Sequence, residues 1–222
     1  MPDPHAWDGQ WTIDSHNLVA LGKTQTGKTS VARELHARTP RVSIWLNEQG
    51  DDRVPGVAGT RVRSVEGARK ALARDETTIN WLSANRDRDI VALRQLTWSL
   101  ADGSNRQLPM QVVADELHRV APQTNERELA PRDAVRRFEK EGVKRNIKFV
   151  GVTQDPVSMD KQALRQAEYR LVFEMSAENQ SAVSEYGFDW DTVLGSDRHT
   201  ATLHDASGRV IEERVKADEK YA

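Results

Sequence analysis

Short runs of β-branched and other apolar residues alternate along the chain with longer helical stretches. The runs predict strands at residues 18–21, 41–46, 78–82, 110–114, 147–153 and 169–175. The stretches between and after them predict helices at residues 28–37, 65–74, 88–101, 131–145, 161–167 and 177–186. This alternation is typical of an α/β fold, in which a mostly parallel sheet carries crossover helices on both faces.

The end of the chain carries a different pattern. Residues 200–204 and 209–215 flank Asp205-Ala206-Ser207-Gly208, whose residue types tolerate the positive φ angles of a tight turn, so we expect a C-terminal β-hairpin. A length of 222 residues suits one domain. We place this domain at residues 17–198, after an N-terminal extension at 1–16 and before the hairpin and tail at 199–222.

Composition excludes several classes of site and protein. The chain has no cysteine, which excludes thiol catalysis, cysteine zinc sites and disulfides and fits a reducing compartment. No stretch approaches the ~20 apolar residues of a membrane span, and the first ten residues lack the pattern of a signal peptide. We therefore expect a cytoplasmic protein. The net charge of −2 argues against nonspecific wrapping of nucleic acid but leaves room for a local basic channel.

Residues 22–29 form a complete G-x-x-x-x-G-K-T motif between a predicted strand and a predicted helix. The glycines let backbone N–H groups surround a β-phosphate, and the helix N-terminus adds the positive end of its dipole. In such a loop Lys28 contacts β- and γ-phosphate oxygens, and the Thr29 hydroxyl binds Mg²⁺. The motif predicts a nucleotide site formed by Gly22, Lys23, Thr24, Gln25, Thr26, Gly27, Lys28, Thr29 and Ser30.

Two adjacent carboxylates, Asp115 and Glu116, follow the apolar strand at residues 110–114. In this context the first would hold Mg²⁺ and the second would orient and deprotonate the attacking water. Adjacent acids at a strand end also occur by chance, but the chain before them leaves room for the inserted β-α units of many P-loop ATPases. The guanine-binding Asn-Lys-x-Asp pattern of GTPases is absent from the sequence, so we expect ATP and Mg²⁺ as the cofactors.

A polar residue, Gln154, ends the predicted strand at residues 147–153. Its amide would face the γ-phosphate, where it can sense that group or hold the attacking water. Alone, Gln154 could equally be an ordinary polar residue at a strand end. Together with Lys28 and Glu116 it becomes a candidate catalytic residue.

The segment Asp-Glu-Leu-His-Arg-Val-Ala-Pro at 115–122 resembles the D-E-A-H-R/N-x-A-P signature of HerA/FtsK-type DNA-translocating ATPases. The resemblance continues at 141–146, at 152–156 (Val-Thr-Gln-Asp-Pro) and, less faithfully, at 45–51, and it spans residues 17–186. It implies a RecA-like (ASCE) P-loop fold. A chain so nearly confined to the motor domain is most similar to the genome-packaging ATPases of membrane-containing icosahedral viruses, an inference that depends on analogy.

The family's arginine in the turn at 141–146 is Val143 here. A catalytic arginine would have to come from elsewhere, and Lys144, Arg145 and then Arg170 are the candidates. Contributed by a neighbouring subunit, such a side chain is worth on the order of 10³–10⁵ in rate.

The sequence patterns that could indicate DNA contacts are less specific than the nucleotide-binding motifs. Arg132, Arg136, Lys140 and Lys144 recur every four residues, and their shared helical face is either a DNA or subunit contact or an ordinary solvated face. The loop at 49–60 is a second candidate. His118 either couples nucleotide state to the following helix or is a packed surface histidine.

The resemblance implies a ring-forming ATPase, expected to be a hexamer, that translocates double-stranded DNA and packages a viral genome. Its partners would then include capsid or portal-vertex proteins, and it would be found in the host cytoplasm or with the virion. Two alternatives stay open: a cellular translocase or helicase subunit acting in repair or plasmid transfer, and a nucleotide-switch assembly protein that moves no DNA.

Overall fold

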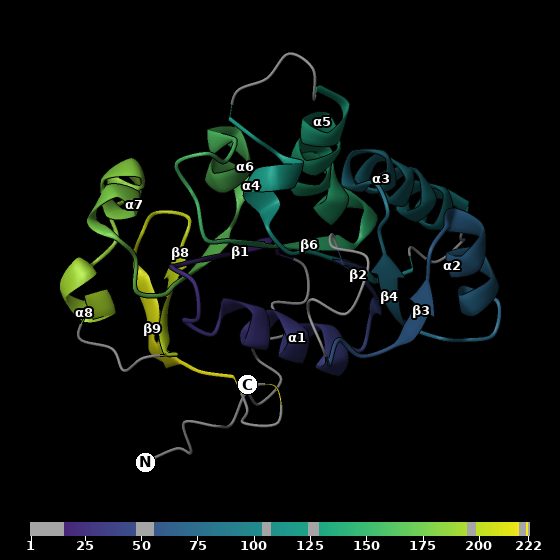
Figure 1. The fold of residues 1–222 in the computed structure, drawn as a ribbon, viewed down its shortest axis with the longest axis horizontal. Coiled ribbons are helices and arrows are strands. Elements are labelled where there is room, and N and C mark those ends of the chain that lie inside the picture. Colours follow the sequence, from purple (N-terminus) through teal and green to yellow (C-terminus); the bar gives the residue numbers. More distant parts are fainter. Residues whose placement is uncertain are drawn as a thin grey trace.

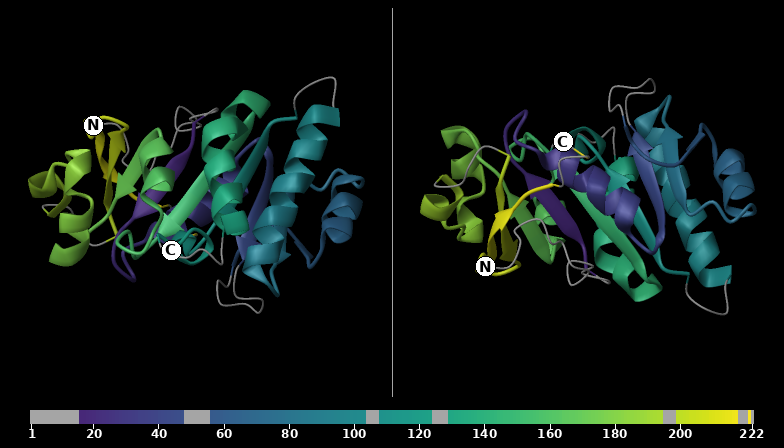
Figure 2. Two further views of the ribbon diagram at one scale, coloured as in Figure 1. Left: turned by 90° about the horizontal axis from the view of Figure 1, so that it is seen from above. Right: turned by 90° about the horizontal axis from the view of Figure 1, so that it is seen from below.

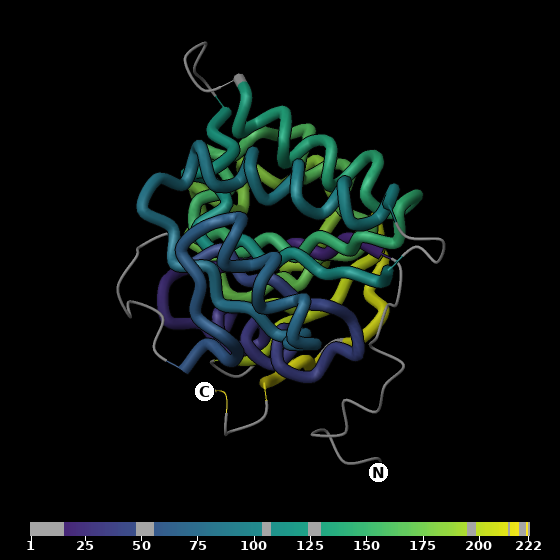
Figure 3. The backbone as a smooth tube through the Cα atoms, turned by 90° about the vertical axis from the view of Figure 1, so that its right-hand side faces the viewer, coloured from purple at the N-terminus to yellow at the C-terminus, as the bar shows by residue number. Residues whose placement is uncertain are grey.

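The computed structural model describes residues 16–47, 56–103, 108–123, 129–194, 199–217 and 221. Over these ranges a nine-stranded sheet carries helices on both faces (Figure 1, Figure 2 and Figure 3). The strands are β1 (Leu18–Leu21), β2 (Val42–Asn47), β3 (Thr60–Val62), β4 (Thr78–Leu82), β5 (Met110–Ala114), β6 (Ile147–Thr153), β7 (Tyr169–Val172), β8 (Ala201–Asp205) and β9 (Val210–Val215). The α-helices are α1 (Lys28–Arg38), α2 (Val65–Leu72), α3 (Arg86–Gly103), α4 (Leu117–Val120), α5 (Leu129–Arg137), α6 (Lys161–Gln166), α7 (Ala177–Ala182) and α8 (Trp190–Leu194). Further turns are the π-helical η3 (Phe138–Gly142) and the 3-10 helices η4 (Val143–Arg145) and η5 (Ser184–Tyr186).

The strand order is β3-β4-β2-β5-β6-β1-β7-β8-β9. Strands β1 to β7 are parallel, whereas β8 and β9 pair in antiparallel fashion and extend the sheet beyond β7. The predicted C-terminal hairpin is thus confirmed as part of the same sheet. Because β6 lies between β1 and β5, the carboxyl ends of these three strands meet at one edge, and the segments that follow them meet there as well.

The central strands are buried on both faces, which explains why their sequences are mostly apolar, with Gln111 on β5 and Lys148 on β6 as buried polar exceptions. On β6, Ile147 and Phe149 belong to the larger core, together with residues of α2 to α6. Val150 and Val152 point to the opposite face and pack in a smaller core with α1 and the hairpin. At Gly151 an added Cβ would lie 2.4 Å from Leu117 Cδ2, so α4 packs directly on the backbone of β6.

A buried histidine ties α1 to the sheet. His36 Nδ1 lies 2.7 Å from Ser43 Oγ on β2, and His36 Nε2 lies 3.1 Å from the carbonyl oxygen of Ala58. Burial lowers the pKa of His36 to about 4, from an ordinary value of 6.5, although the bond to Ala58 opposes this shift. The imidazole is therefore neutral in the folded protein at pH 7.

Because of His36, we expect the free energy of unfolding to be about 2 kcal/mol lower at pH 5 than at pH 7. The unfolded chain takes up the proton near pH 6.5 and the folded chain only near pH 4, so stability falls across that window as the pH decreases. Denaturant unfolding at the two pH values should show a smaller loss in His36→Gln than in the wild type. An unchanged loss in His36→Gln would contradict the assignment.

The predicted helix at 131–145 is helical throughout, but its second half is not α-helical, because α5 gives way to the π turn η3 and then to the 3-10 helix η4. The Glu139 carbonyl within the π turn accepts a 2.7 Å hydrogen bond from Asn17 Nδ2, and Asn17 Oδ1 accepts one from the Phe149 backbone N–H. Because π and 3-10 turns do not contain 3.6 residues, spacing by four no longer marks one face beyond Arg137. The proposed strip from Arg132 to Lys144 is therefore not a single helical face.

Other differences are local. The predicted strand at 169–175 ends three residues earlier, at Val172, and β3, α4 and α8 are additional short elements. Residues 1–15 of the expected extension and residues 49–55 of the loop at 49–60 lie outside the described residues, and Thr60 already begins β3. In the part of the chain that is described, no helix has the length and apolar character needed to cross a membrane.

Candidate active site

The motif at residues 22–29 forms the loop between β1 and α1. Gly22 is required by close approach, because a Cβ at this position would lie 2.6 Å from Phe173 Cβ. Gly27 precedes α1 with a φ of 99°, a conformation that L side chains rarely adopt. No side chain caps the N-terminus of α1, so its first N–H groups are available to an anion.

Lys28 is nearly buried at the start of α1, with 6% of its surface exposed. Its ammonium donates a 2.6 Å hydrogen bond to the carbonyl of Lys23 within the loop. Burial lowers the pKa of Lys28 to about 8, although the negative charges of Asp115 and Glu116 oppose this shift. A buried ammonium at the N-terminus of α1 is well placed to bind phosphate oxygens.

The first acid lies beside the loop. The Thr29 hydroxyl donates to Asp115 Oδ2 at 3.4 Å, and burial raises the pKa of Asp115 to about 6. A hydroxyl and a carboxylate are oxygen donors, and Mg²⁺ commonly takes one or two such protein ligands beside substrate phosphates and water. Thr29 and Asp115 therefore fit a magnesium site.

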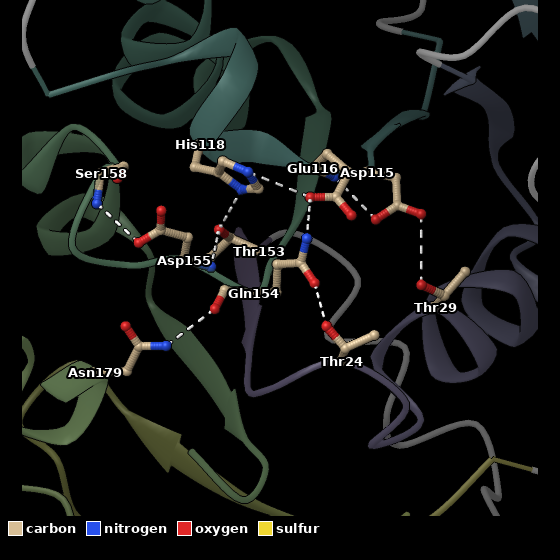
Figure 4. Close-up of polar contacts among 10 residues, drawn as sticks. All are labelled: Thr24, Thr29, Asp115, Glu116, His118, Thr153, Gln154, Asp155, Ser158 and Asn179. Atoms are coloured by element: carbon tan, nitrogen blue, oxygen red, sulfur yellow. Dashed lines mark hydrogen bonds and ion pairs between the residues drawn. The ribbon is translucent and has the colours of Figure 1, made fainter. Parts of the chain in front are cut away.

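The second acid and the predicted sensor contact one another (Figure 4). Glu116 has a φ of 51° and directly precedes α4, which turns its carboxylate toward the end of β6. Gln154 Nε2 donates to Glu116 Oε2 at 3.2 Å, while Gln154 Oε1 accepts from the Thr24 hydroxyl at 2.5 Å. A single amide thus links the phosphate loop to the acid that follows β5.

His118 lies on the other side of Glu116 (Figure 4). Its Nε2 is 3.4 Å from Glu116 Oε2, and its Nδ1 is 3.0 Å from the Thr153 hydroxyl. Burial is the main cause that lowers the pKa of His118. Of the two interpretations left open by the sequence, this geometry favours a role in the site, because His118 contacts both the acid and the end of β6.

Sequence reasoning missed two side chains of this network, Thr153 and Asn179. Asn179 Nδ2 donates to the Gln154 carbonyl at 3.0 Å, which ties α7 to the end of β6. The position of Thr153 at a strand end, beside Gln154, could have indicated its role. Asn179 lies 25 residues further along the chain, in a segment with no recognisable motif.

The candidate arginines lie elsewhere. Lys144 and Arg145 precede β6 and so lie at the edge of the sheet opposite the phosphate loop. Arg145 pairs with Asp102 at 3.2 Å, and its guanidinium lies 5.2 Å from the centre of the Trp98 ring. Neither side chain therefore contributes to the site of its own chain.

Arg170 does not suit the role of an arginine that enters a neighbouring site. Only 1% of its surface is exposed. Its guanidinium donates to the carbonyls of Leu164, Asp205 and Ala206 and lies 4.8 Å from the centre of the Tyr186 ring. Arg170 therefore joins β7 to α6 and to the hairpin turn, and the candidates for the catalytic cation narrow to Lys144 and Arg145.

Comparison with known proteins supports the fold. No family model and no curated protein matches the sequence. The genome-packaging NTPase B204 of Sulfolobus turreted icosahedral virus 2, in complex with AMPPCP, matches with a TM-score of 0.70 at 12% identity, over 93% of this chain and 100% of that one. The DNA-packaging ATPase B204 of Sulfolobus turreted icosahedral virus has a TM-score of 0.70 at 12% identity, over 92% and 98%. VirB4 of Thermoanaerobacter pseudethanolicus has a TM-score of 0.64 at 9% identity, over 92% and 90%.

At such identities these likenesses concern the fold alone. In this fold β6 separates the loop-bearing β1 from the acid-bearing β5. The fold expected from the motifs is confirmed, with its mostly parallel open sheet and its C-terminal antiparallel hairpin. The chain has the fold of the P-loop ATPases, and viral genome-packaging ATPases are among its structural neighbours.

Proposed function

We propose that this chain is an ATPase motor that translocates double-stranded DNA into a viral capsid. The observation that carries the proposal is the convergence of Lys28, Thr29, Asp115, Glu116 and Gln154 at one edge of the sheet. The Thr29 hydroxyl lies 3.4 Å from Asp115 Oδ2, and Gln154 Nε2 lies 3.2 Å from Glu116 Oε2. These residue types are the ones that hydrolysis of a bound triphosphate requires.

In the proposed reaction, water attacks the γ-phosphorus, the bond to the β–γ bridging oxygen breaks, and ADP and phosphate leave. Glu116 accepts the proton of the attacking water, and the Gln154 amide fixes that water between itself and the γ-phosphate. Lys28 exchanges the Lys23 carbonyl for phosphate oxygens and stabilises the negative charge that develops on them. Mg²⁺, held by Thr29 and Asp115, supplies further neutralisation of the phosphate charge when bound.

A ring of subunits would complete this site. An opening of about 540 Å³ lies beside the catalytic network and is lined by Lys23, Thr24, His118, Gln154 and Asp155, among others. It gives room for a cation from a neighbouring chain, and Lys144 and Arg145 are suitably placed at the opposite edge of the sheet to supply one. We propose a hexamer in which one of them performs this role, with capsid or portal-vertex proteins as further partners.

We expect duplex DNA to stimulate ATP hydrolysis severalfold, because translocation couples the two activities. Steady-state ATPase rates should be measured with and without duplex DNA from low to high salt, with native mass spectrometry on the same samples. Stimulation should weaken as salt rises, because phosphate contacts release counterions. The DNA-free protein and single-stranded DNA are the controls.

The alternative functions predict other results. Absence of stimulation at every salt concentration, with normal basal hydrolysis, would overturn the motor and favour a nucleotide switch. A monomer under conditions of full DNA-stimulated activity would instead contradict the proposed ring.

A further inference from the structure

A second hollow adjoins the phosphate loop on the side away from the catalytic acids. Its volume is about 460 Å³, within the range of roughly 300–1,000 Å³ that is typical of small-molecule sites. Residues of the loop and of the first turn of α1 form one side. The other side is formed by His199, Lys216 and Ala217, which belong to none of the motifs in the sequence.

The topology of the hairpin explains how these three residues reach the loop. Because β8 runs antiparallel to β7, the beginning of β8 and the end of β9 lie at the edge where β1 ends. His199 comes just before β8, and Lys216 and Ala217 come just after β9. Figure 1 and Figure 2 show the chain after β9 continuing on the face of the sheet that carries α1.

His199 packs directly on the loop. A Cβ at Gly27 would lie 3.3 Å from the His199 carbonyl oxygen and 3.4 Å from its Cα and Cβ. His199 itself has a φ of 72°, which is uncommon for a residue other than glycine. Its backbone is thus fixed against the loop in an unusual conformation, while the residue as a whole remains exposed at the edge of the hollow.

We propose that this hollow holds the purine base and ribose of the nucleotide whose phosphates occupy the loop. The inference depends on the proposed function, because it requires a nucleoside triphosphate in that loop. The imidazole of His199 stacks on the base, as aromatic side chains do with nucleobases. Ala217 packs against the apolar faces of the base and ribose, and Lys216 adds positive charge beside the phosphates.

Isothermal titration of His199→Ala with ATP and with inorganic tripolyphosphate, both with Mg²⁺, tests the inference. Loss of one base-stacking contact should weaken ATP binding about tenfold. Tripolyphosphate has no base, so its affinity should be unchanged. His199→Phe keeps a stacking ring and should retain most of the ATP affinity, and His199→Asn tolerates the positive φ and should behave as the alanine variant if both fold. His16→Ala, which lies at the other end of β1, is the matched control.

The possible outcomes separate the two proposals. Unchanged ATP affinity in His199→Ala would overturn the base pocket and leave the phosphate site intact. Equal weakening of ATP and tripolyphosphate would also overturn it, because His199 would then act only by supporting the loop. Failure of the wild-type protein to bind either compound would contradict the proposed function itself.

Discussion

Glu116→Gln is expected to lower kcat for ATP hydrolysis by about 10²–10⁴-fold while leaving ATP affinity nearly unchanged. The amide is almost the same size as the carboxylate and can still contact Gln154 and His118. It cannot accept the proton of the attacking water, so the chemical step loses its base. The variant should therefore accumulate bound ATP.

Single-turnover hydrolysis and nucleotide-binding assays on the same preparation separate these effects. Glu66→Gln is the matched control, because Glu66 lies on the surface of α2 with 76% of its side chain exposed and pairs only with Lys70 among the described residues. It should hydrolyse ATP at the wild-type rate. Normal turnover in Glu116→Gln would show that the assigned base is wrong.

Lys28→Met is expected to reduce kcat/KM for ATP by at least about 10²–10³-fold, since it removes a charge that stabilises the transition state. The same change should leave the nucleotide-free protein at least as stable as the wild type. Burial lowers the pKa of Lys28 to about 8, which means that the fold disfavours the charged side chain, and methionine removes that charge at similar length. Loss of function would thus accompany unchanged or increased stability.

Thermal unfolding with and without MgATP checks both parts of this prediction. Wild-type protein should gain stability from the nucleotide, and Lys28→Met should not. Lys161→Met, on an exposed position at the start of α6, should retain the wild-type response. A marked loss of stability in nucleotide-free Lys28→Met would indicate a structural role for the lysine instead.

Much of the fold could be predicted from the sequence because the central strands are buried on both faces. Strands that are buried on both faces are mostly apolar in sequence, and β1, β4, β5 and β6 have the predicted bounds. The three-residue β3 at the edge of the sheet and the four-residue α4 are too short to leave a periodic pattern. The π turn could not be predicted, because it is stabilised by Asn17, which is 122 residues away in the sequence.

The candidate site was predictable to the extent that it follows strand ends. The loop, the acid pair and Gln154 each follow a parallel strand, so the topology alone brings them together. Their catalytic roles stay predictions until the variants are measured. The sequence did not reveal that Arg170 is buried by contacts within its own chain. Its carbonyl partners come from α6 and the hairpin turn, and no local sequence pattern connects these segments to β7.

The absence of a side chain at Gly151 has a mechanical consequence. The Leu117 side chain packs directly against the backbone of Gly151, so no side chain separates α4 from the last residues of β6 at this point. We therefore expect Glu116, which precedes α4, and Gln154, which follows β6, to move together, so that a displacement of one also displaces the other.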